Sequence, residues 1–311
     1  MRVLVQLPLN EAQLARLMAA APEADFTFVL PEEVTDEMVA KAEAIIGNVD
    51  AGRLARASRL RLIQLNSAGY DNYATASLPK GAALCCATGA YGQAVSEHLF
   101  AMVLAMMKRL PDYHSRQLAH EWKDLGPVTS PRGSRVLILG AGDIGTSLAE
   151  LFSAMGSEVT GVRSHAAAPH APFCAMGTLA DLPRLLPEAD VVASVLPSTP
   201  ATRGIANAAF FSAMREGAWF ANAGRGDLVD QGALVAALES GHLAGAALDV
   251  TTPEPLPQDS PLWDAPGLLL TPHISGFFHL PVTLDNIVDI AAENLAHLIA
   301  GEPLRNQVLL G

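Results

Sequence analysis

Short apolar runs of strand length recur along the chain, and helical or polar stretches separate them. Strands that alternate with helices are typical of a parallel sheet with crossover helices. The pattern predicts strands over residues 3–7, 26–30, 44–46, 62–65, 83–86, 136–139, 159–162, 191–196, 218–221, 243–250 and 268–270. We therefore expect an α/β protein whose chain forms two successive units of this kind.

The helical segments are predicted from apolar residues that recur every three or four positions. A helix over residues 11–20 and a closing helix over residues 287–300 follow this pattern. The longest pattern runs from Tyr91 to about Trp122, and Pro111 should kink or split it. Its expected buried stripe consists of Leu99, Met102, Val103, Met106 and Met107.

One stretch combines a strand, a glycine turn and a helix. The strand at residues 136–139 ends at Gly140, and Gly140-x-Gly142-x-x-Gly145 leads into a predicted helix over residues 146–155. Gly140 can form the tight turn, Gly142 lets the backbone approach a pyrophosphate, and Gly145 lets helix and strand pack closely. The first N–H groups of the helix would face the phosphates. A glycine-rich turn of another α/β protein is the alternative, but the flanking strand and helix favour a dinucleotide site.

Composition and charge exclude several classes of function. The chain has 311 residues, half of them hydrophobic, which suffices for two domains with separate cores. Its net charge of −12 argues against a nucleic-acid-binding surface and means that local arginines must attract any anionic substrate. The most apolar segment, residues 94–107, contains Glu97 and His98 and is too short to span a membrane. We therefore expect neither a nucleic acid nor a membrane as partner.

The three cysteines form no disulfide framework, because Cys85 and Cys86 are adjacent and Cys174 stands alone. A reducing, cytoplasmic compartment fits this usage best. The apolar stretch at the start of the chain soon reaches Pro8 and Asn10. It is too short for the apolar region of a secretory signal, so we expect no such signal. We assign no residue to a metal.

Three side chains near predicted strand ends could carry out chemistry together. Arg225 lies between two glycines, and its guanidinium suits a two-point grip on a carboxylate. Glu254 lies in a proline-rich stretch, and His273 follows a strand. A histidine held by a carboxylate is the usual acid–base pair at neutral pH. Each residue alone is more often structural or solvated, but after a dinucleotide motif the three together indicate hydride transfer to a carbonyl beside a carboxylate.

The chain resembles the D-isomer-specific 2-hydroxyacid dehydrogenases, and among them the glyoxylate/hydroxypyruvate reductase-like members. The resemblance covers nearly the whole chain through an ordered set of motifs: Ser67-Ala-Gly-Tyr-Asp-Asn72, Ala94-Val-Ser-Glu-His98, the glycine motif, Leu196-Pro-Ser-Thr-Pro-Ala-Thr202, Asn222-Ala-Gly-Arg-Gly-Asp-Leu-Val-Asp230, Ala247-Leu-Asp-Val-Thr-Thr-Pro-Glu-Pro255, Thr271-Pro-His273 and Gly301-Glu-Pro-Leu-Arg-Asn306. It implies two doubly wound parallel-sheet domains, Rossmann or flavodoxin-like, with a cleft between them. Residues 1–98 and 281–311 would form the substrate domain, and residues 99–280 the dinucleotide-binding Rossmann domain. A homodimer would form through the latter.

The resemblance also implies roles for individual residues. Arg225 would grip the substrate carboxylate and polarise the keto oxygen, His273 would protonate that oxygen, and Glu254 would orient His273 and favour its charged form. Ala68 and Gly69 match the backbone donors for the carboxylate. The implied cofactor contacts are Gly140, Gly142, Asp143, Ile144, Gly145, Arg163, Ser164, Leu196, Pro197, Thr202, Ala223, Gly224, Asp249, His273 and Gly276, with Asp249 at the nicotinamide carboxamide.

Two positions depart from the common pattern of the family. Arg often stands where this chain has Asp143, and an acid beside a pyrophosphate is unhelpful unless it points away. NAD-preferring members carry Asp at the end of the second strand, where this chain has Arg163 and Ser164. Because an arginine can pair with a 2′-phosphate, we expect NADP as the preferred cofactor, with NAD as the alternative.

The sequence therefore predicts NADPH-dependent reduction of a small 2-keto acid, such as glyoxylate or hydroxypyruvate, to the D-2-hydroxy acid. A formate dehydrogenase of the same fold is the nearest alternative enzyme, but that enzyme has Gln in the role of Glu254. A dinucleotide-sensing, corepressor-like binding protein is the alternative of another class. The compact chain, without a long polar extension for partner motifs, argues against it.

Overall fold

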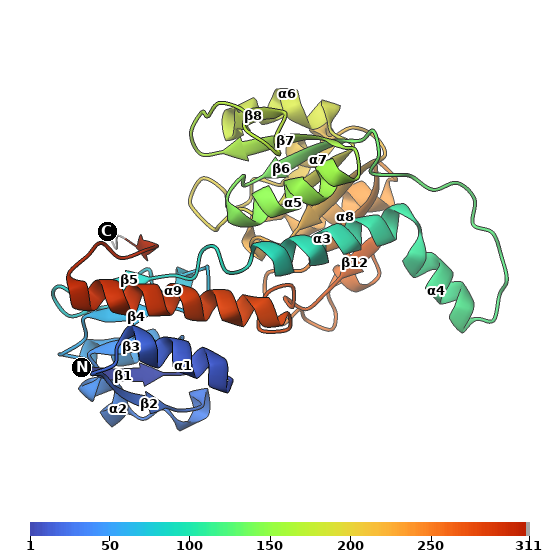
Figure 1. Ribbon diagram of the computed structural model, residues 1–311. Coiled ribbons are helices and arrows are strands. Elements are labelled where there is room, and N and C mark those ends of the chain that lie inside the picture. Colours follow the sequence, from blue (N-terminus) through green and yellow to red (C-terminus); the bar gives the residue numbers. More distant parts are fainter. Residues whose placement is uncertain (309–311) are drawn as a thin grey trace. The chain divides into compact units, whose positions relative to one another are not determined.

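A computed structural model describes residues 1–308 of the chain. The chain forms two compact α/β units, which can be followed in Figure 1. The continuous unit comprises Gly92–His279, and the discontinuous unit comprises Met1–Tyr91 together with Leu280–Gly311. The chain therefore begins in the discontinuous unit, builds the whole continuous unit, and then returns.

A seven-stranded parallel sheet forms the centre of the continuous unit, in the order β12-β11-β10-β9-β6-β7-β8. Its strands are β6 (Arg135–Leu139), β7 (Glu158–Arg163), β8 (Ala175–Thr178), β9 (Val191–Ser194), β10 (Ala218–Asn222), β11 (Leu243–Leu248) and β12 (Leu268–Leu270). From β6 the chain adds β7 and β8 on one side and then returns to place β9 on the other side. Open α/β sheets bind ligands at such a switch point, beyond the carboxyl ends of the strands.

Helices cover both faces of this sheet (Figure 1). The helices of the continuous unit are α3 (Gly92–Met107), α4 (Leu110–Leu118), α5 (Asp143–Ala154), α6 (Leu182–Leu185), α7 (Ala208–Ala213) and α8 (Gln231–Glu239). Side chains alternate along each strand, so Val136 and Ile138 pack with α3 and α5, whereas Leu137 and Leu139 join the core formed with α6, α7 and α8. Burial on both faces explains why the sequence shows these strands as continuous apolar runs.

A six-stranded sheet forms the centre of the discontinuous unit, in the order β13-β5-β4-β3-β1-β2. Its strands are β1 (Arg2–Val5), β2 (Asp25–Phe28), β3 (Ala44–Ile46), β4 (Leu62–Gln64), β5 (Ala83–Cys85) and β13 (Gln307–Val308). β13 pairs antiparallel with β5, and the other pairs are parallel. The helices of this unit are α1 (Glu11–Ala20), α2 (Asp36–Lys41) and α9 (Pro281–Ala300). The predicted class, an α/β protein with two mainly parallel sheets, is confirmed.

The helix α9 ties the end of the chain to its beginning. Arg16 of α1 forms an ion pair with Asp285 of α9. Further along α9, the buried Asn294 donates to Oε1 of Gln64, also buried, over 2.6 Å. Two buried amides that bond each other satisfy groups that would be costly to leave unpaired. The last part of the chain is therefore integral to the unit that the first part begins.

The long helical pattern is split near Pro111, as predicted. Arg109 has a left-handed φ of 57° between α3 and α4. Pro111 lies in the first turn of α4, where a missing N–H costs no helical hydrogen bond. The helix then ends at Leu118, so the expectation that it reaches about Trp122 is wrong.

Two strands escape the sequence prediction. β8 has the sequence Ala-Met-Gly-Thr, which is not a clear apolar run, and β13 has only two residues. Both lie at sheet edges, where burial on two faces is not required. The expected domain limits after residues 98 and 280 stay a prediction. Within residues 1–308, no helix combines the length and the apolar character needed to cross a membrane.

Candidate active site

The predicted cofactor and catalytic residues of the continuous unit gather at the carboxyl edge of its sheet. Each one ends or follows a strand, and the six strands concerned are neighbours in the sheet, from β12 to β7. The positions are Gly140, Gly142, Asp143, Ile144 and Gly145 after β6; Arg163 and Ser164 at the end of β7; Leu196, Pro197 and Thr202 after β9; Ala223, Gly224 and Arg225 after β10; Asp249 and Glu254 after β11; and His273 and Gly276 after β12. Topology thus brings to one edge residues that are far apart in the sequence.

The glycine turn after β6 has a backbone suited to phosphate. Gly140 has a φ of +105°, which favours glycine. A Cβ atom on Gly145 would stand 2.0 Å from the carbonyl oxygen of Gly140, so glycine is needed for α5 to approach this closely. Gly142 is the N-cap of α5, and a Cβ atom there would meet no atom within 4 Å. Because Gly142 has no side chain to cap the helix, the first N–H groups of α5 can bind an anion.

Asp143, the acid in this turn, faces the amino end of α3. Its Oδ1 lies 3.0 Å from the position that a Cβ atom would take on Gly92, the first residue of α3. Oγ of Ser147 lies 2.7 Å from the same point. A carboxylate beside the N–H groups of a helix N-terminus is favourable. This placement explains how an acid is tolerated in a phosphate-binding turn.

A pocket of about 500 Å³ opens between the glycine turn and the segments after β7 and β9. Its lining includes the predicted residues Gly140, Gly142, Arg163, Ser164, Leu196, Pro197 and Thr202. The volume is that of a small-molecule cofactor site, so these residues fit a dinucleotide. Sequence reasoning missed several other residues of the lining, among them Leu179, Thr199 and Ala201. Leu179 directly follows the unpredicted strand β8, and the motif that ends at Thr202 could have indicated the other two.

Arg163 folds back along the glycine turn. Its Nε donates to the carbonyl oxygen of Ala141 over 2.7 Å. Across the described residues 1–308, its two terminal amino groups meet no hydrogen-bond acceptor. Ser164 and His165 line the same part of the pocket. Two N–H-bearing groups and a hydroxyl are therefore available to an anion there.

Close backbone contacts hold the loop that carries Arg225. A Cβ atom on Gly224 would stand 2.4 Å from the carbonyl oxygen of Leu196, and one on Gly226 would stand 2.0 Å from that of Thr251. The two glycines thus let this loop touch the loops after β9 and β11. Nη1 of Arg225 donates to the carbonyl oxygen of Gly224 over 2.8 Å, which directs the guanidinium.

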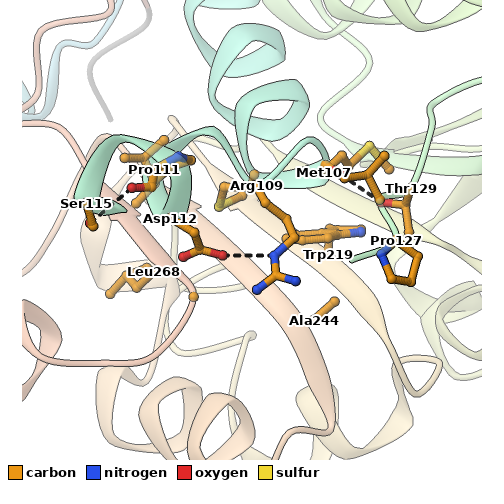
Figure 2. Close-up of a pocket in the computed structure, with 14 residues that line it drawn as sticks. Met107, Arg109, Pro111, Asp112, Ser115, Pro127, Thr129, Trp219, Ala244 and Leu268 are labelled. Carbon is orange, nitrogen blue, oxygen red and sulfur yellow. Dashed lines mark hydrogen bonds and ion pairs between the residues drawn. The ribbon is translucent and has the colours of Figure 1, made fainter. Parts of the chain in front are cut away.

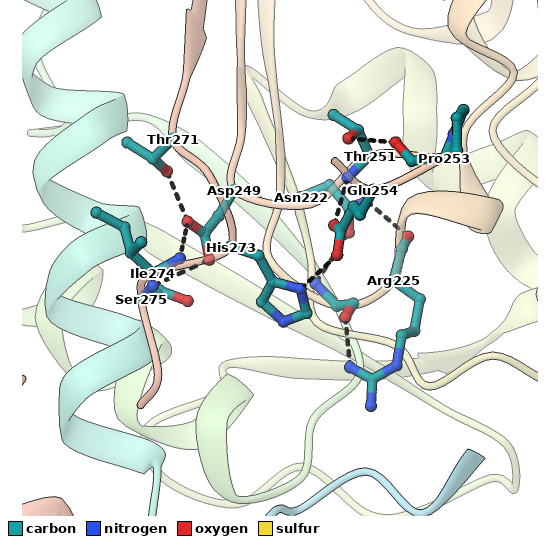
Figure 3. Close-up of polar contacts among 11 residues, drawn as sticks. Asn222, Arg225, Asp249, Thr251, Pro253, Glu254, Thr271, His273, Ile274 and Ser275 are labelled. Carbon is teal, nitrogen blue, oxygen red and sulfur yellow. Dashed lines mark hydrogen bonds and ion pairs between the residues drawn. The ribbon is translucent and has the colours of Figure 1, made fainter. Parts of the chain in front are cut away.

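Glu254 and His273 form a direct pair (Figure 3). Nδ1 of His273 lies 2.8 Å from Oε2 of Glu254, while Oε1 accepts the backbone N–H of Thr251 over 2.9 Å. Because a carboxylate only accepts, Nδ1 of His273 carries a proton, and the other ring nitrogen is left for chemistry. In Figure 3 the guanidinium of Arg225 and the imidazole of His273 extend toward the same side of these loops. The pair could give or take one proton at Nε2.

Asp249 is a fully buried carboxylate. It accepts hydrogen bonds from Oγ1 of Thr271 over 2.6 Å and from the backbone N–H groups of Ile274 and Ser275 over 3.0 and 3.1 Å. Burial alone would raise the pKa of Asp249, but hydrogen bonds from Ser275, Thr271 and Ile274 together hold it below its usual value of 3.8. Asp249 is therefore charged at neutral pH.

The expected carboxylate donors, Ala68 and Gly69, lie in the discontinuous unit after β4. Ser67 organises their backbone, because its Oγ donates to the carbonyl oxygen of Gly69 over 2.6 Å. The oxygen of the same hydroxyl accepts a hydrogen bond from Nδ2 of Asn48 over 3.1 Å. These bonds shape a short loop at the carboxyl edge of the six-stranded sheet.

Another pocket, of about 470 Å³, lies at the amino edge of the seven-stranded sheet (Figure 2). Side chains from the end of α3, from α4 and from the starts of β10 to β12 line it, including Arg109, Asp112, Trp219 and Leu268. Arg109 pairs with Asp112 over 3.0 Å inside it. It contains none of the predicted site residues, so size alone does not make it the active site.

Comparison with known proteins decides the family. Residues 100–275 match the family model described as D-isomer specific 2-hydroxyacid dehydrogenase, NAD binding domain. The glyoxylate/hydroxypyruvate reductase B of Citrobacter koseri is 34% identical over 290 residues, which cover 89% of this chain and 88% of that protein. The chain belongs to the D-isomer specific 2-hydroxyacid dehydrogenase family. It is an NAD(P)-dependent 2-hydroxyacid dehydrogenase, as the motifs predicted.

Solved structures agree with this family assignment. The dehydrogenase matches a D-isomer specific 2-hydroxyacid dehydrogenase family protein from Aeromonas salmonicida subsp. salmonicida A449 with a TM-score of 0.88 and 31% identity, over 100% of this chain and 99% of that chain. It also matches the NADPH-dependent glyoxylate/hydroxypyruvate reductase from Sinorhizobium meliloti, solved with NADP and sulfate, with a TM-score of 0.82 and 26% identity, over 99% and 98% of the two chains. The dehydrogenase therefore has the α/β fold of its family.

Proposed function

We propose that this dehydrogenase reduces a small 2-keto acid, of the glyoxylate and hydroxypyruvate class, to the D-2-hydroxy acid with NADPH. The hydrogen-bonded pair of His273 and Glu254 carries the proposal, because it supplies an oriented proton donor at the edge where the dinucleotide pocket opens. Glu254 also argues against formate oxidation, which requires no proton relay. The relative from Citrobacter koseri bears the name glyoxylate/hydroxypyruvate reductase B, which supports the substrate class.

The residues of this chain would divide the chemistry between them. Arg225 would hold the substrate carboxylate with its fork of N–H donors and polarise the keto oxygen. When bound, the cofactor would supply the hydride that reduces the keto carbon. Nε2 of His273 would give its proton to the keto oxygen, and Glu254 would balance the charge of the imidazolium before that transfer. Backbone N–H groups of Ala68 and Gly69 would also donate to the carboxylate.

NADP is the proposed cofactor, and Arg163 is the reason. A guanidinium at the end of the second strand can pair with the 2′-phosphate, whereas the ribose hydroxyls of NAD need an acceptor that arginine lacks. The bond from Nε of Arg163 to Ala141 leaves the two terminal amino groups for this phosphate. The reductase from Sinorhizobium meliloti was solved with NADP, which supports the same choice.

We also propose a homodimer formed through the continuous unit. The segment around α4 exposes large apolar side chains, with Leu118 at 72% and Trp122 at 106% exposure. Several large apolar side chains exposed in one segment are typical of a surface that another protein covers. The reducing cytoplasm stays the proposed compartment, supported by the free state of Cys85, Cys86 and Cys174.

The experiment is a rate comparison on the purified protein. Oxidation of NADPH and of NADH is followed with glyoxylate, hydroxypyruvate, pyruvate and bulkier 2-keto acids, and the chirality of the product is determined. We expect kcat/KM with NADPH to exceed that with NADH by about tenfold or more, because a charge-assisted phosphate contact is worth about that much. Activity confined to formate oxidation, or none with any keto acid, would overturn the proposal.

A further inference from the structure

The backbone around His273 is held in an unusual conformation by hydrogen bonds to Asp249 and to the carbonyl oxygen of Thr271. His273 has a φ of 52°, in the left-handed region that non-glycine residues rarely adopt. Such a residue persists only where its surroundings fix it. The carbonyl oxygen of Asp249 accepts the N–H of His273 over 2.7 Å, and the Asp249 carboxylate accepts the N–H groups of Ile274 and Ser275. Asp249 therefore clamps the proton donor and the two residues that follow it.

The carboxylate of Asp249 is itself held through Thr271. Oγ1 of Thr271 lies 2.6 Å from Oδ1 of Asp249 and 3.6 Å from Sδ of Met102. A hydroxyl has one proton, and a carboxylate is a far stronger acceptor than a thioether. Thr271 therefore donates to Asp249 and has only its lone pairs for any further partner.

His98 of α3 completes this chain of hydrogen bonds. Its Nε2 lies 3.0 Å from Oγ1 of Thr271 and 3.6 Å from Oδ1 of Asp249. Because the Thr271 proton is used on Asp249, Nε2 of His98 must carry the hydrogen and donate to Thr271. The direction of the chain of hydrogen bonds is therefore fixed. His98 donates to Thr271, and Thr271 donates to Asp249. The Asp249 carboxylate also accepts the backbone N–H groups of the two residues after His273.

We infer that His98 is a positioning residue for the proton donor: through Thr271 and Asp249 it fixes the backbone of residues 273–275 and hence the direction of the His273 imidazole. The inference rests on the proposed function, in which His273 gives the proton. It also explains why a histidine stands on the otherwise apolar face of α3, beside Met102, where a leucine would pack as well. A misplaced donor lowers the rate of the chemical step more than it weakens binding.

The test compares variants that keep or remove the donor at residue 98. His98→Leu removes the N–H, whereas His98→Gln keeps an N–H near the position of Nε2. Thr271→Val removes the middle link with almost no change in volume, and Thr271→Ser keeps it. Glu97→Gln is the control on α3, because Glu97 is exposed and pairs with Gln93. Thr283→Val is the control for a buried threonine, since its hydroxyl lacks a partner within residues 1–308.

Two readouts are used, and one needs no turnover. For His98→Leu and Thr271→Val we expect kcat with NADPH and a keto acid to fall ~10–100-fold, with both KM values within ~3-fold of the unmodified protein. His98→Gln and Thr271→Ser should recover most of kcat. Without cofactor, amide hydrogens of Ile274 and Ser275 should exchange roughly tenfold faster in the two disruptive variants, while the controls change neither readout.

Several outcomes would overturn the inference. Unchanged kcat in His98→Leu does so, as does a loss that His98→Gln shares in full, or unchanged exchange at Ile274 and Ser275. If His98→Leu does not fold, Thr271→Val is judged by the same criteria, because it adds no bulk. If the unmodified protein has no reductase activity, the proposed function is wrong. If it is active but the His98 variants have normal kcat, only the positioning role is wrong.

Discussion

Nδ1 of His273 lies 2.8 Å from Oε2 of Glu254, and the other oxygen of that carboxylate accepts the backbone N–H of Thr251. Glu254 is therefore fixed at one oxygen before it holds the imidazole with the other. Both side chains are partly exposed, at 47% for His273 and 37% for Glu254. The pair is oriented without being buried, so its proton can reach a substrate.

Glu254→Gln should lower the reductive kcat by at least ~10-fold, with little change in the KM for the cofactor. The single amide oxygen can still accept from Nδ1 of His273, but the NH2 group beside it cannot accept the N–H of Thr251, so the variant loses the negative charge and one of the two hydrogen bonds that Glu254 receives. Initial rates with saturating NADPH and keto acid measure this, and Glu97→Gln is the matched control. A variant as fast as the unmodified protein, with the chemical step shown to limit the rate, would remove Glu254 from the mechanism.

Arg225→Ala should lose on the order of 3 kcal/mol in kcat/KM, because a charged hydrogen-bonded pair with the substrate carboxylate is lost. Arg225→Lys should recover only part of this, since a point charge lacks the fork of donors. Arg215→Ala is the control: Arg215 forms an ion pair with Asp190 and precedes β10, at the amino edge of the sheet. Near-normal kinetics for Arg225→Ala would contradict the assignment.

Gly142→Ala should weaken NADPH binding while leaving the melting temperature of the cofactor-free protein unchanged. A Cβ atom on Gly142 meets nothing within 4 Å, so its cost appears only when a pyrophosphate approaches. Gly145→Ala should lower the melting temperature, because its Cβ would stand 2.0 Å from a carbonyl oxygen. Gly232→Ala, in the first turn of α8 with an ordinary contact at 3.5 Å, should change neither property. Calorimetry and fluorescence titration separate the three outcomes.

Arg163→Asp should reverse the preference between the cofactors. The change removes the cation that would pair with the 2′-phosphate and adds an anion that repels it and can accept from the ribose hydroxyls of NAD. The ratio of kcat/KM for NADPH to that for NADH should move by at least ~100-fold, as two successive tenfold effects. A ratio that does not move would place cofactor discrimination elsewhere in the pocket.

Thiol modification should distinguish Cys174 from the buried pair. Burial raises the pKa of the Cys85 thiol to about 12, with a further contribution from the neighbouring Cys86. Cys85 is therefore neutral from pH 7 to 10, and only a thiolate attacks an aromatic disulfide reagent. We expect Cys174 to react rapidly in the folded protein and the other two only after unfolding, with the fast phase absent in Cys174→Ser. Rapid reaction of all three thiols in the folded protein would contradict the burial of Cys85 and Cys86.

Much of the fold follows from the sequence because both faces of each central strand are buried. Such strands are continuous apolar runs, as in β6 with Val-Leu-Ile-Leu, and they can be recognised in the sequence. β8 and β13 lie at edges and lack this signal. The end of α4 at Leu118 was also unpredictable, because the polar residues that follow are compatible with a helix or a loop.

The candidate site was predicted through residues whose chemistry is local. The glycines of the Gly140-x-Gly142-x-x-Gly145 motif predict the turn, and the two glycines beside Arg225 indicate that its backbone can approach a ligand. The direction of the Asp143 side chain toward Gly92 could not be predicted, because it depends on how α3 and α5 pack. The same holds for His98, which the sequence suggests only as an interruption of an apolar helix face and which acquires meaning through Thr271, far along the chain.

The six-stranded sheet is completed by β13, the last described element of the chain, and α9 packs against α1 in the same unit. The residues of the continuous unit, by contrast, follow one another without interruption from Gly92 to His279. During synthesis, all residues of the continuous unit are therefore available for folding before the discontinuous unit has received α9 and β13. Until residues 281–308 have been synthesised, β5 is an edge strand and α1 lacks its neighbour α9, so the nascent first segment exposes surface that the folded protein covers.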